Sequence, residues 1–562
     1  MASDRLLQIA SFIVLLGVLI FVHELGHFLV AKALNVKVLR FSIGFGPAIW
    51  SFRRGETEYR VAILPLGGYV KMAGDDPGEE LAPEDRGRGF LEQSPWRRFA
   101  IAAAGPAMNL IFPLFVYFAI AIIQNGKPTA APVVGSVAAG SPAEAAGLQP
   151  DDHILSVTVP GGAAVPIRYF ADLREVLSPN PGRPLSFEVE RDGHKLAPIQ
   201  IAPDAESDPS NPVEEKKRGV IGVISTYQAA VVAPAQPGSA GPLRPFDLVV
   251  RANGKPIAHY AQLSHALAAA PCAPMDLTVM REQPVDVPGA KLSTYAPIEL
   301  KGVPTCDGAR PSIAPADPTV SSFVASVVPG SPAQKAGLRV GDRIVEANGT
   351  TIHSWRDFPS PKAGEGFRLV LAGGKTLEFV PGTEEQRDPM TGDKRPQLVP
   401  GFSYDQRDLG EHGARLVLAS ALAVPQVPLE RGIGEMVQRS ATNLASVTRM
   451  TVLGIAGIIR GHISLKTVGG PIMLFDVAGK AAEAGLAQFL NMLALISINL
   501  GLMNLLPIPV LDGGLLVTSL AEVVTRRQLS LRAREIANLV GIVLLVALML
   551  VVFKNDIMRS LG

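Results

Sequence analysis

Four long apolar segments constrain the fold of this chain more than any other feature. They cover residues 6–34, 99–123, 486–506 and 536–553, and a short polar stretch interrupts the first of them. A helix crosses the hydrocarbon core of a bilayer with about 20 mainly apolar residues, so each segment is long enough to span it. The first apolar run is too long for a signal peptide, and no small-residue cleavage site follows it. The sequence therefore predicts a polytopic α-helical membrane protein with four transmembrane helices.

The composition agrees with a membrane protein and excludes several other classes. Hydrophobic residues make up 48% and charged residues 18% of the 562 residues, whereas about 25% of the residues in soluble proteins are charged. The 52 Lys and Arg balance the 51 Asp and Glu, which excludes the strongly basic surface of a nucleic-acid-binding protein. We therefore expect the lipid bilayer, and no nucleic acid, as a partner.

The short loops predict the orientation in the membrane, because Lys and Arg are enriched on the cytoplasmic side. Ten Lys and Arg lie between the first and second segments, and four follow the third: Arg526, Arg527, Arg532 and Arg534. Both short loops should therefore be cytoplasmic. Both termini and the long polar insertion, from residue 125 to about 483, should lie outside.

The polar insertion contains a phrase that occurs three times. It reads GSPAEAAGLQPDDHI from residue 140, GSAGPLRPFDLVVRANG from residue 238 and GSPAQKAGLRVGDRIVEANG from residue 330. Each copy follows a β-branched stretch and is typical of a loop, a short helix, a turn and a strand. The spacing of about 90–100 residues suits one small domain per copy. The phrase resembles the PDZ domain of bacterial membrane and periplasmic proteases, and the second copy is degenerate.

These patterns predict an extracytoplasmic insertion of tandem α+β PDZ domains between two transmembrane parts. The expected parts are transmembrane helices over 1–125, PDZ-like domains over 126–210, 218–303 and 319–383, an amphipathic membrane-proximal region over 400–483, and transmembrane helices over 484–562. Pro-, Asp- and Ser-rich linkers separate the repeats. Cys272 and Cys306 lie near the second repeat. They pair in an oxidising compartment or remain two separate thiols, and the sequence leaves both readings open.

The first apolar segment contains ionisable residues, in FVHELGHFLV. Such residues cost free energy inside a membrane and usually mark function. On a helix, His23 and His27 lie one turn apart on the same face, so both imidazoles can reach one metal ion. Glu24 can then take a proton from an activated water without being a ligand. The alternative is a pair of histidines hydrogen-bonded to neighbouring helices.

A hydrolytic zinc ion needs a third protein ligand and an open position. Asp512 is the candidate, in NLLPIPVLDGG at the end of the third apolar segment. Two prolines and two glycines break the helix there, and non-helical backbone at that depth requires protein or a water-filled cavity around it. The alternative is a turn that ends the helix, with a solvated Asp512.

The HExxH motif, the LDG motif and the repeats between them resemble the site-2 protease family of zinc intramembrane metalloproteases over essentially the whole chain. GPAMN, residues 105–109, looks like the GPxxN motif of that family. LGGYVKM, residues 66–72, looks like its membrane-associated β-loop. One departure is the number of PDZ-like repeats, three here where two are usual.

The resemblance implies a site and a reaction. One Zn²⁺ per chain would be held by His23, His27 and Asp512, with Glu24 as the catalytic acid–base. Substrate backbone would be bound by five residues: Asn499, Asn504, Gly67, Gly68 and Tyr69. The substrates would be single-span membrane proteins, such as pre-cut anti-sigma factors or remnant signal peptides. The protein would lie in the bacterial inner membrane, with periplasmic PDZ domains and an active site near the cytoplasmic side.

Two other functions compete with the protease. A membrane-tethered PDZ adaptor or chaperone without proteolytic activity would be favoured by loss of one ligand, and none is missing. A metal transporter would also hold a metal between helices. It would normally have repeated spans and several intramembrane ligands, which four spans and one HExxH do not supply.

Overall fold

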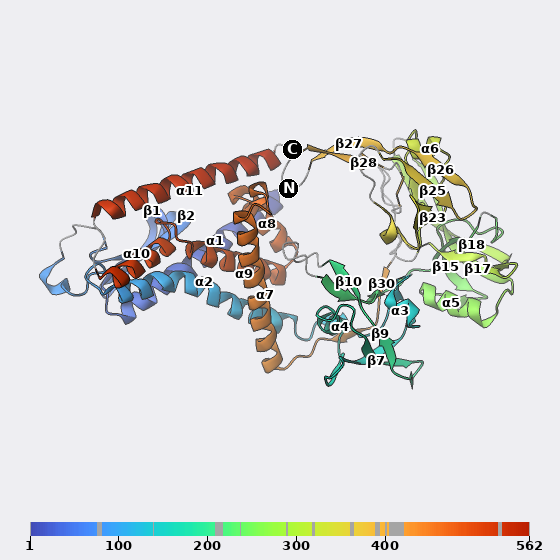
Figure 1. Cartoon of the computed structure of the whole chain (residues 1–562), viewed down its shortest axis with the longest axis horizontal. Helices are drawn as coiled ribbons and strands as arrows, with labels where there is room; N and C mark the ends of the chain where they lie inside the picture. The colour runs from blue at the N-terminus through green and yellow to red at the C-terminus, as the bar shows by residue number, and fades with distance from the viewer. Residues whose placement is uncertain are drawn as a thin grey trace. The chain divides into compact units, whose positions relative to one another are not determined.

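The computed structural model describes residues 2–75, 81–138, 140–207, 217–236, 238–287, 290–316, 321–359, 365–387, 394–399, 402–403, 421–526 and 531–560. They form two compact units (Figure 1). Unit 1 comprises Met1–Lys127, Arg387–Asp393 and Glu430–Gly562, and unit 2 comprises Pro128–Gln386 and Lys394–Leu429.

Helices dominate unit 1. All four predicted spans are helical, as α1 (Ala2–Ala33), α2 (Pro95–Gln124), α9 (Leu486–Asn504) and α11 (Leu531–Ser560). The unit also contains α7 (Ile433–Ile459), α8 (Pro471–Glu483), α10 (Asp512–Thr525) and the short 3-10 helices η1 (Pro83–Asp85) and η3 (Leu465–Thr467). Within the described part of the chain, the four predicted spans and α7 are long and apolar enough to cross a membrane. The chain is therefore a polytopic membrane protein.

The helices around α2 approach it closely because glycines remove side chains from the contacts. A Cβ atom on Gly26 of α1 would lie 2.3 Å from the carbonyl oxygen of Ala104. A Cβ atom on Gly501 of α9 would lie 3.0 Å from the carbonyl oxygen of Pro106. Small residues allow such close backbone packing of membrane helices. Thus α1 and α9 are both held against the same stretch of α2.

A buried ion pair fastens α10 to the first turn of α2. The Arg98 guanidinium donates to the Glu522 carboxylate, and both side chains are almost fully buried. A charge that is removed from water needs such a partner. The pair fixes the position of α10, whose first residue is Asp512.

The end of α11 caps the start of α8. The Asp556 carboxylate accepts hydrogen bonds from the backbone N–H groups of Gly470 and Ile472, each at 2.9 Å. A carboxylate is favourable at a helix N-terminus, where N–H groups lack partners within the helix. Helix α8 packs in turn on α1, where Phe475 meets Phe12 edge-on.

A β-hairpin, β1 (Val38–Arg54) and β2 (Thr57–Met72), follows α1. Both strands bend, so that residues 38–43 pair with the first part of β2 on one side and with residues 68–72 on the other. Segment 68–72 is therefore an edge of this small sheet. In the described residues, its recorded strand pairings lie on one side only.

Unit 2 contains three α+β modules, each with its own apolar core. The first has α3 (Pro142–Ala145), α4 (Phe170–Leu177), and the sheet β6 (Ala164–Pro166), β5 (His153–Thr158), β7 (Leu185–Arg191), β8 (His194–Lys195), with β9 (Ile199–Ile201) paired to β7. The second has α5 (Tyr260–Ala269) and the sheet β18 (Ala290–Val303), β17 (Met275–Val287), β15 (Asp247–Ala252), β14 (Val231–Pro234), β21 (Ile313–Pro315), with β16 (Lys255–Pro256) paired to β15. The third has α6 (Pro332–Lys335), η2 (Trp355–Asp357) and the sheet β24 (Thr350–Thr351), β23 (Ile344–Ala347), β25 (Phe367–Leu371), β26 (Thr376–Phe379).

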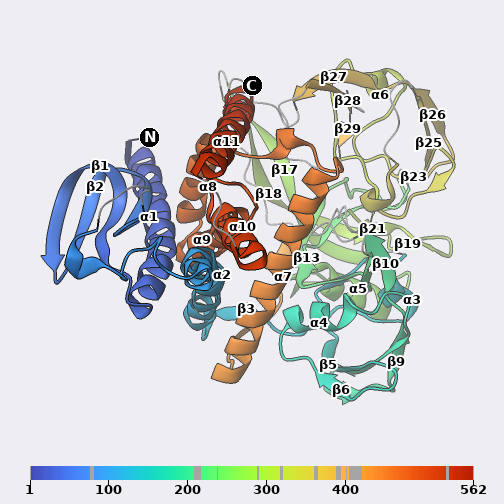
Figure 2. The same cartoon turned by 60° about the vertical axis from the view of Figure 1, so that its left-hand side comes forward.

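Short two-stranded pairs complete this unit. They are β3 (Pro128–Ala130) with β31 (Gln426–Pro428), β4 (Ser136–Val137) with β12 (Val223–Ile224), β10 (Asp204–Ser207) with β11 (Lys217–Val220), β13 (Thr226–Gln228) with β30 (Ala421–Ala423), β19 (Cys306–Asp307) with β20 (Arg310–Pro311), β22 (Ser326–Val327) with β29 (Phe402–Ser403), and β27 (Gly382–Arg387) with β28 (Lys394–Val399). The first of these pairs joins the first and the last residues of unit 2, and β3 is labelled in Figure 2.

The apolar cores extend beyond two of the predicted domain ends. The core of the first module includes Ile221, past the predicted end at 210, because β11 folds back onto β10 after the polar linker. The core of the second module reaches Ile313, past the predicted end at 303. The core of the third module lies within the predicted 319–383. Parts of all three predicted linkers lie outside the described residues.

A disulfide bond joins Cys272 and Cys306 within the second module. The sequence left open whether these cysteines pair or remain separate thiols, and in the structure they are paired. Disulfides persist in oxidising compartments such as the bacterial periplasm.

Candidate metal centre

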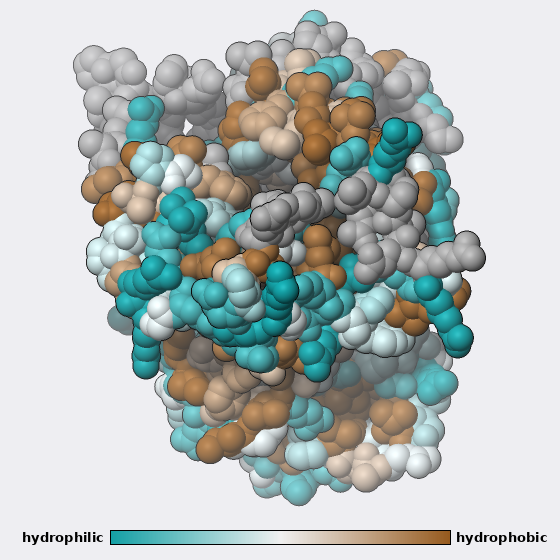
Figure 3. Space-filling model, turned by 90° about the vertical axis from the view of Figure 1, so that its left-hand side faces the viewer, coloured by the Kyte–Doolittle hydropathy of each residue, from teal (hydrophilic) through white to brown (hydrophobic). Residues whose placement is uncertain are grey.

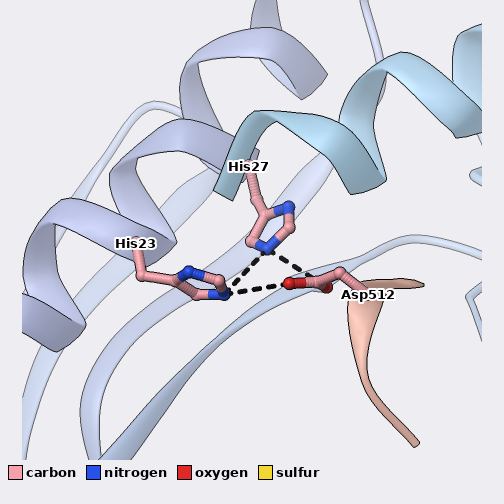
Figure 4. Close-up of side chains that lie close together, drawn as sticks. All are labelled: His23, His27 and Asp512. Atoms are coloured by element: carbon pink, nitrogen blue, oxygen red, sulfur yellow. Dashed lines mark hydrogen bonds and ion pairs between the residues drawn. The ribbon is translucent and has the colours of Figure 1, made fainter. Parts of the chain in front are cut away.

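Three side chains from the two ends of the chain meet in unit 1 (Figure 4). The Nε2 atoms of His23 and His27 lie 3.3 Å apart. The carboxylate of Asp512 faces both, with Oδ2 at 3.1 Å from Nε2 of His23 and Oδ1 at 3.4 Å from Nε2 of His27. Side-chain exposure is 12% for His23, 11% for His27 and 21% for Asp512. The structure thus brings together the three residues that the sequence nominated as ligands.

Local backbone structure explains how each side chain reaches this point. The two histidines lie one turn apart on α1 and share a face. The chain leaves α9 at Asn504, passes through a proline-containing turn and starts α10 at Asp512. A Cβ atom on Gly513 would lie 2.0 Å from the carbonyl oxygen of Leu506. Glycine after Asp512 therefore lets the turn fold back tightly enough to aim the carboxylate at α1.

The separations of the donor groups suit a tetrahedral zinc ion. Two ligand atoms at typical zinc distances of about 2.0–2.1 Å and at a tetrahedral angle are about 3.3 Å apart. The two Nε2 atoms are 3.3 Å apart, close to that value, and each lies within 3.4 Å of one oxygen of the Asp512 carboxylate, Oδ2 for His23 and Oδ1 for His27. Two neutral imidazoles and one carboxylate are also a common donor set of hydrolytic zinc sites, which keep a fourth position open.

Helix α2 contacts the other side of both imidazoles. Nδ1 of His27 lies 2.7 Å from the carbonyl oxygen of Ile101. Nδ1 of His23 lies 3.1 Å from the side-chain amide of Asn109. Between these two contacts, a Cβ atom on Gly105 would lie 2.2 Å from Nε2 of His27. The imidazoles are therefore confined by α2 from behind and face Asp512 in front.

A cavity of about 250 Å³ opens beside the three side chains. Its lining combines the nominated ligands with Glu24 and with the end of β2: His23, Glu24, His27, Gly68, Tyr69, Val70, Met72, Phe90, Ile101, Ala102, Asp512 and Leu515. A Cβ atom on Gly68 would lie 2.9 Å from Cγ of Glu24. The edge segment 68–72 therefore runs directly past the side chain of Glu24.

The other nominated substrate-binding residues lie at different distances from this cavity. The Asn504 amide is 3.4 Å from Nε2 of His23, so it is at the metal centre. The carbonyl oxygen of the Asn499 amide accepts a hydrogen bond of 3.0 Å from Thr451 on α7. Gly67 faces Phe45 of β1, since a Cβ atom there would lie 2.2 Å from that ring. The structure thus groups Asn504 with the three ligands, and places Asn499 and Gly67 against neighbouring elements.

Sequence reasoning gave no role to the face of α2 that contacts the histidines. Ile101, Gly105 and Asn109 are spaced by four residues, so they share one face of the helix. The signal was present in the GPAMN motif, which begins at Gly105 and ends at Asn109. The motif alone did not indicate that its partner is the HExxH helix.

Comparison with known proteins identifies the family. The model of peptidase family M50 matches residues 11–548. Protease RseP of Yersinia pestis is 31% identical over 561 residues, which cover 98% of each chain. The regulator of sigma-E protease RseP of Escherichia coli strain K12 is 31% identical over 559 residues, again covering 98% of each chain. A relative from Neisseria meningitidis that carries a zinc metalloprotease name is 29% identical over 561 residues, covering 98% of this chain and 99% of the relative.

The family match over nearly the whole chain agrees with the HExxH helix, the carboxylate that faces it and the several apolar helices around them. The chain therefore belongs to peptidase family M50, the site-2 proteases, and is a zinc-dependent metalloprotease of the membrane.

Proposed function

We propose that this protein cleaves single-span membrane proteins within or near the bilayer, at a zinc centre held by His23, His27 and Asp512. One observation carries the proposal: the three donor atoms, Glu24 and an open strand edge all border one cavity among membrane helices. A non-proteolytic adaptor would not need this combination. The intact donor set therefore favours the protease over the adaptor.

The bound metal would supply Lewis-acid chemistry, lowering the pKa of water and polarising a carbonyl oxygen. The role of His23, His27 and Asp512 is to hold it with their donor atoms on one side and to leave the cavity side open. The closeness of their separations to tetrahedral edges supports this assignment.

Glu24 is the proposed general base and acid. It follows His23 on α1 and lines the same cavity, but it is not one of the three clustered donors. It would accept a proton from the attacking water and later donate it to the leaving amine. The backbone of β2 beside it restricts where its carboxylate can point.

Segment 68–72 is the proposed docking edge for substrate. A peptide inside a membrane helix has its amide groups hydrogen-bonded, so it must unwind before a water can attack it. An unwound segment leaves backbone N–H and C=O groups without partners, which costs free energy in a nonpolar environment. Adding that segment as a strand to the open edge of β2 would satisfy these groups beside Glu24. The Asn504 amide is placed to bond one more backbone group, whereas Asn499 would first have to release Thr451.

We also propose that the modules of unit 2 are PDZ domains on the periplasmic side and that the metal centre lies near the cytoplasmic side. The disulfide in the second module supports an oxidising compartment for unit 2. Within unit 1, Arg53 and Arg54 are exposed at the tip of the β1–β2 hairpin, and Figure 3 shows a band of hydrophilic side chains between hydrophobic areas on the face it presents. Basic residues at the hairpin tip support a cytoplasmic location.

Four crossing helices, with α7 as a membrane-proximal element, are the proposed topology. Helix α7 is long enough to span, but it runs across the direction of α2 and α11 rather than along it (Figure 1). Its buried residues are few: Met436, Ser440 and Gly457. An even number of crossings keeps both ends of the chain on one side, as the basic loops predict.

The family and the relatives support the proposed substrate class. The Escherichia coli relative is named as a regulator of sigma-E protease, a role that belongs to that protein. For this chain, we propose pre-cut anti-sigma factors or remnant signal peptides. Each is a single membrane span without a large folded domain attached, so no such domain has to unfold before cleavage.

A comparison of membrane-protein fragments in cells with the wild-type protein and with Glu24→Gln tests this function. The variant keeps the ligand set but removes the proton acceptor, so we expect one or more truncated single-span proteins to accumulate only in the variant. The purified wild type should cleave such a fragment in detergent, and the Glu24→Gln variant should not. Equal fragment patterns together with equal cleavage by both proteins would contradict the proposal.

A further inference from the structure

A histidine binds zinc through Nε2 only when the proton of the neutral ring sits on Nδ1. The partner of Nδ1 therefore decides whether the ring is ready to bind. For His27 this partner is the carbonyl oxygen of Ile101 at 2.7 Å. A carbonyl can only accept, so Nδ1 of His27 carries the proton and Nε2 faces the centre with its lone pair.

His23 differs, because its Nδ1 faces the side-chain amide of Asn109. The amide nitrogen lies 3.1 Å from Nδ1. An N–H group that donates to Nδ1 would place the ring proton on Nε2. That atom faces Nε2 of His27 at 3.3 Å, Oδ2 of Asp512 at 3.1 Å and the amide nitrogen of Asn504 at 3.4 Å. A ring in this tautomer could not bind a metal through Nε2.

Rotation of the amide by 180° exchanges its oxygen and its nitrogen, which have nearly the same shape. The oxygen of the Asn109 amide is buried and has no hydrogen-bond partner among the described residues. Nothing in this part of the chain therefore ties the amide to an orientation that donates to His23. With the oxygen toward His23, Nδ1–H donates, and Nε2 is free to bind a metal.

The backbone carbonyl of Asn109 already has a partner, so the side-chain amide is the part of this residue that can accept a hydrogen bond from His23. The residue is fully buried between α1, α2 and α9. Its backbone carbonyl accepts a hydrogen bond of 2.8 Å from Ser497. A Cβ atom on Gly501 would lie 3.2 Å from the Cβ atom of Asn109, so α9 packs tightly over this residue.

We propose that Asn109 is a positioning residue, whose side-chain oxygen accepts the Nδ1–H of His23 and so holds His23 in the tautomer that binds zinc through Nε2. Ile101 does the same for His27 through its backbone, so one face of α2 prepares both rings. This inference rests on the ligand set of the proposed function.

Zinc affinity, measured by chelator competition on the purified protein in detergent, tests the inference. Loss of a hydrogen bond to a ligating histidine typically weakens metal binding by about 10–100-fold. We therefore expect Asn109→Leu, which can neither donate nor accept, to bind zinc about 10–100-fold more weakly than wild type. Asn109→Asp keeps an acceptor of nearly the same shape and should stay within a few-fold of wild type. Ser497→Ala is the matched control, since it removes the other buried hydrogen bond to Asn109, and it should leave the affinity unchanged.

The outcomes separate this inference from the ligand set. If Asn109→Asp weakens zinc binding as much as Asn109→Leu, the amide does not act as an acceptor and the inference is wrong. Unchanged affinity in Asn109→Leu overturns it as well. If His23→Ala binds zinc as tightly as wild type, the ligand set itself fails.

A second measurement reads the protonation of His23 in the wild-type protein itself. In wild-type protein labelled with ¹⁵N-histidine and loaded with zinc, the signals missing from His23→Ala belong to His23. Its Nδ1 should show the chemical shift of a protonated nitrogen. An unprotonated Nδ1 would overturn the inference.

Discussion

Adding one methyl group at Gly105 should break the metal centre without touching a ligand. A Cβ atom at this position would lie 2.2 Å from Nε2, 2.6 Å from Cε1 and 2.8 Å from Cδ2 of His27. Ordinary contacts of such an atom begin at 3.4 Å, so Nε2 would have to move by about 1.2 Å. Metal–ligand distances vary by only about 0.2 Å, so a ligand atom displaced this far no longer binds.

The assay is the zinc affinity of Gly105→Ala compared with Gly17→Ala, both purified in the same detergent. Gly17 lies on the same helix as His27, but a Cβ atom there has no neighbour within 4 Å. The control should bind zinc as wild type does, because alanine favours a helix slightly over glycine. Gly105→Ala should lose about 100-fold or more in affinity, since displacing a ligand costs more than losing a hydrogen bond to one. Equal affinities in the two variants would refute the proposed contact between α2 and His27.

Three further sets of variants test the strand edge beside Glu24, the ion pair between α2 and α10, and the cap of α8. Gly68→Ala places a methyl group 2.7 Å from Cγ2 of Ile20, 2.8 Å from the carbonyl oxygen of Ser42 and 2.9 Å from Cγ of Glu24. The strand edge and Glu24 must therefore shift, so peptide cleavage should fall by about tenfold or more while the zinc content stays unchanged. A loss of zinc would show that Gly68 also supports the metal centre. Arg98→Leu or Glu522→Leu alone leaves a buried charge unpaired, which costs about 3–5 kcal/mol, whereas the double variant should be more stable than either in thermal denaturation. Asp556→Ala removes the cap of α8, so limited proteolysis between α7 and α8 should become faster, and an unchanged rate would show that the cap does not hold this region.

The sequence predicted the four apolar helices, and it nominated three ligand residues that the structure brings together. Apolar length alone located all four predicted spans, because a bilayer leaves few alternatives to a helix. HExxH predicted that His23 and His27 point the same way, since helical spacing fixes that relation locally. Asp512, almost 500 residues away, could be nominated only because its turn interrupts a membrane helix.

The sequence did not predict which segments far apart in the chain contact each other. Arg98 and Glu522 are 424 residues apart, and nothing in either segment names the other as its partner. The role of Gly105 depends on a neighbouring helix in the same way. Two apolar cores extend past the predicted domain ends for a related reason, since a linker rich in proline predicts a loop, not the return of the next strand to the preceding module.

The zinc content of the purified protein, measured by elemental analysis for the wild type and for three single variants, tests the central claim most directly. The account predicts about one zinc per chain in the wild type, because two imidazoles and one carboxylate complete a hydrolytic site with an open position. His23→Ala, His27→Ala and Asp512→Ala should each lower the zinc content markedly, while the proteins remain folded. A wild type without zinc, or an Asp512→Ala variant with unchanged zinc content, would contradict it.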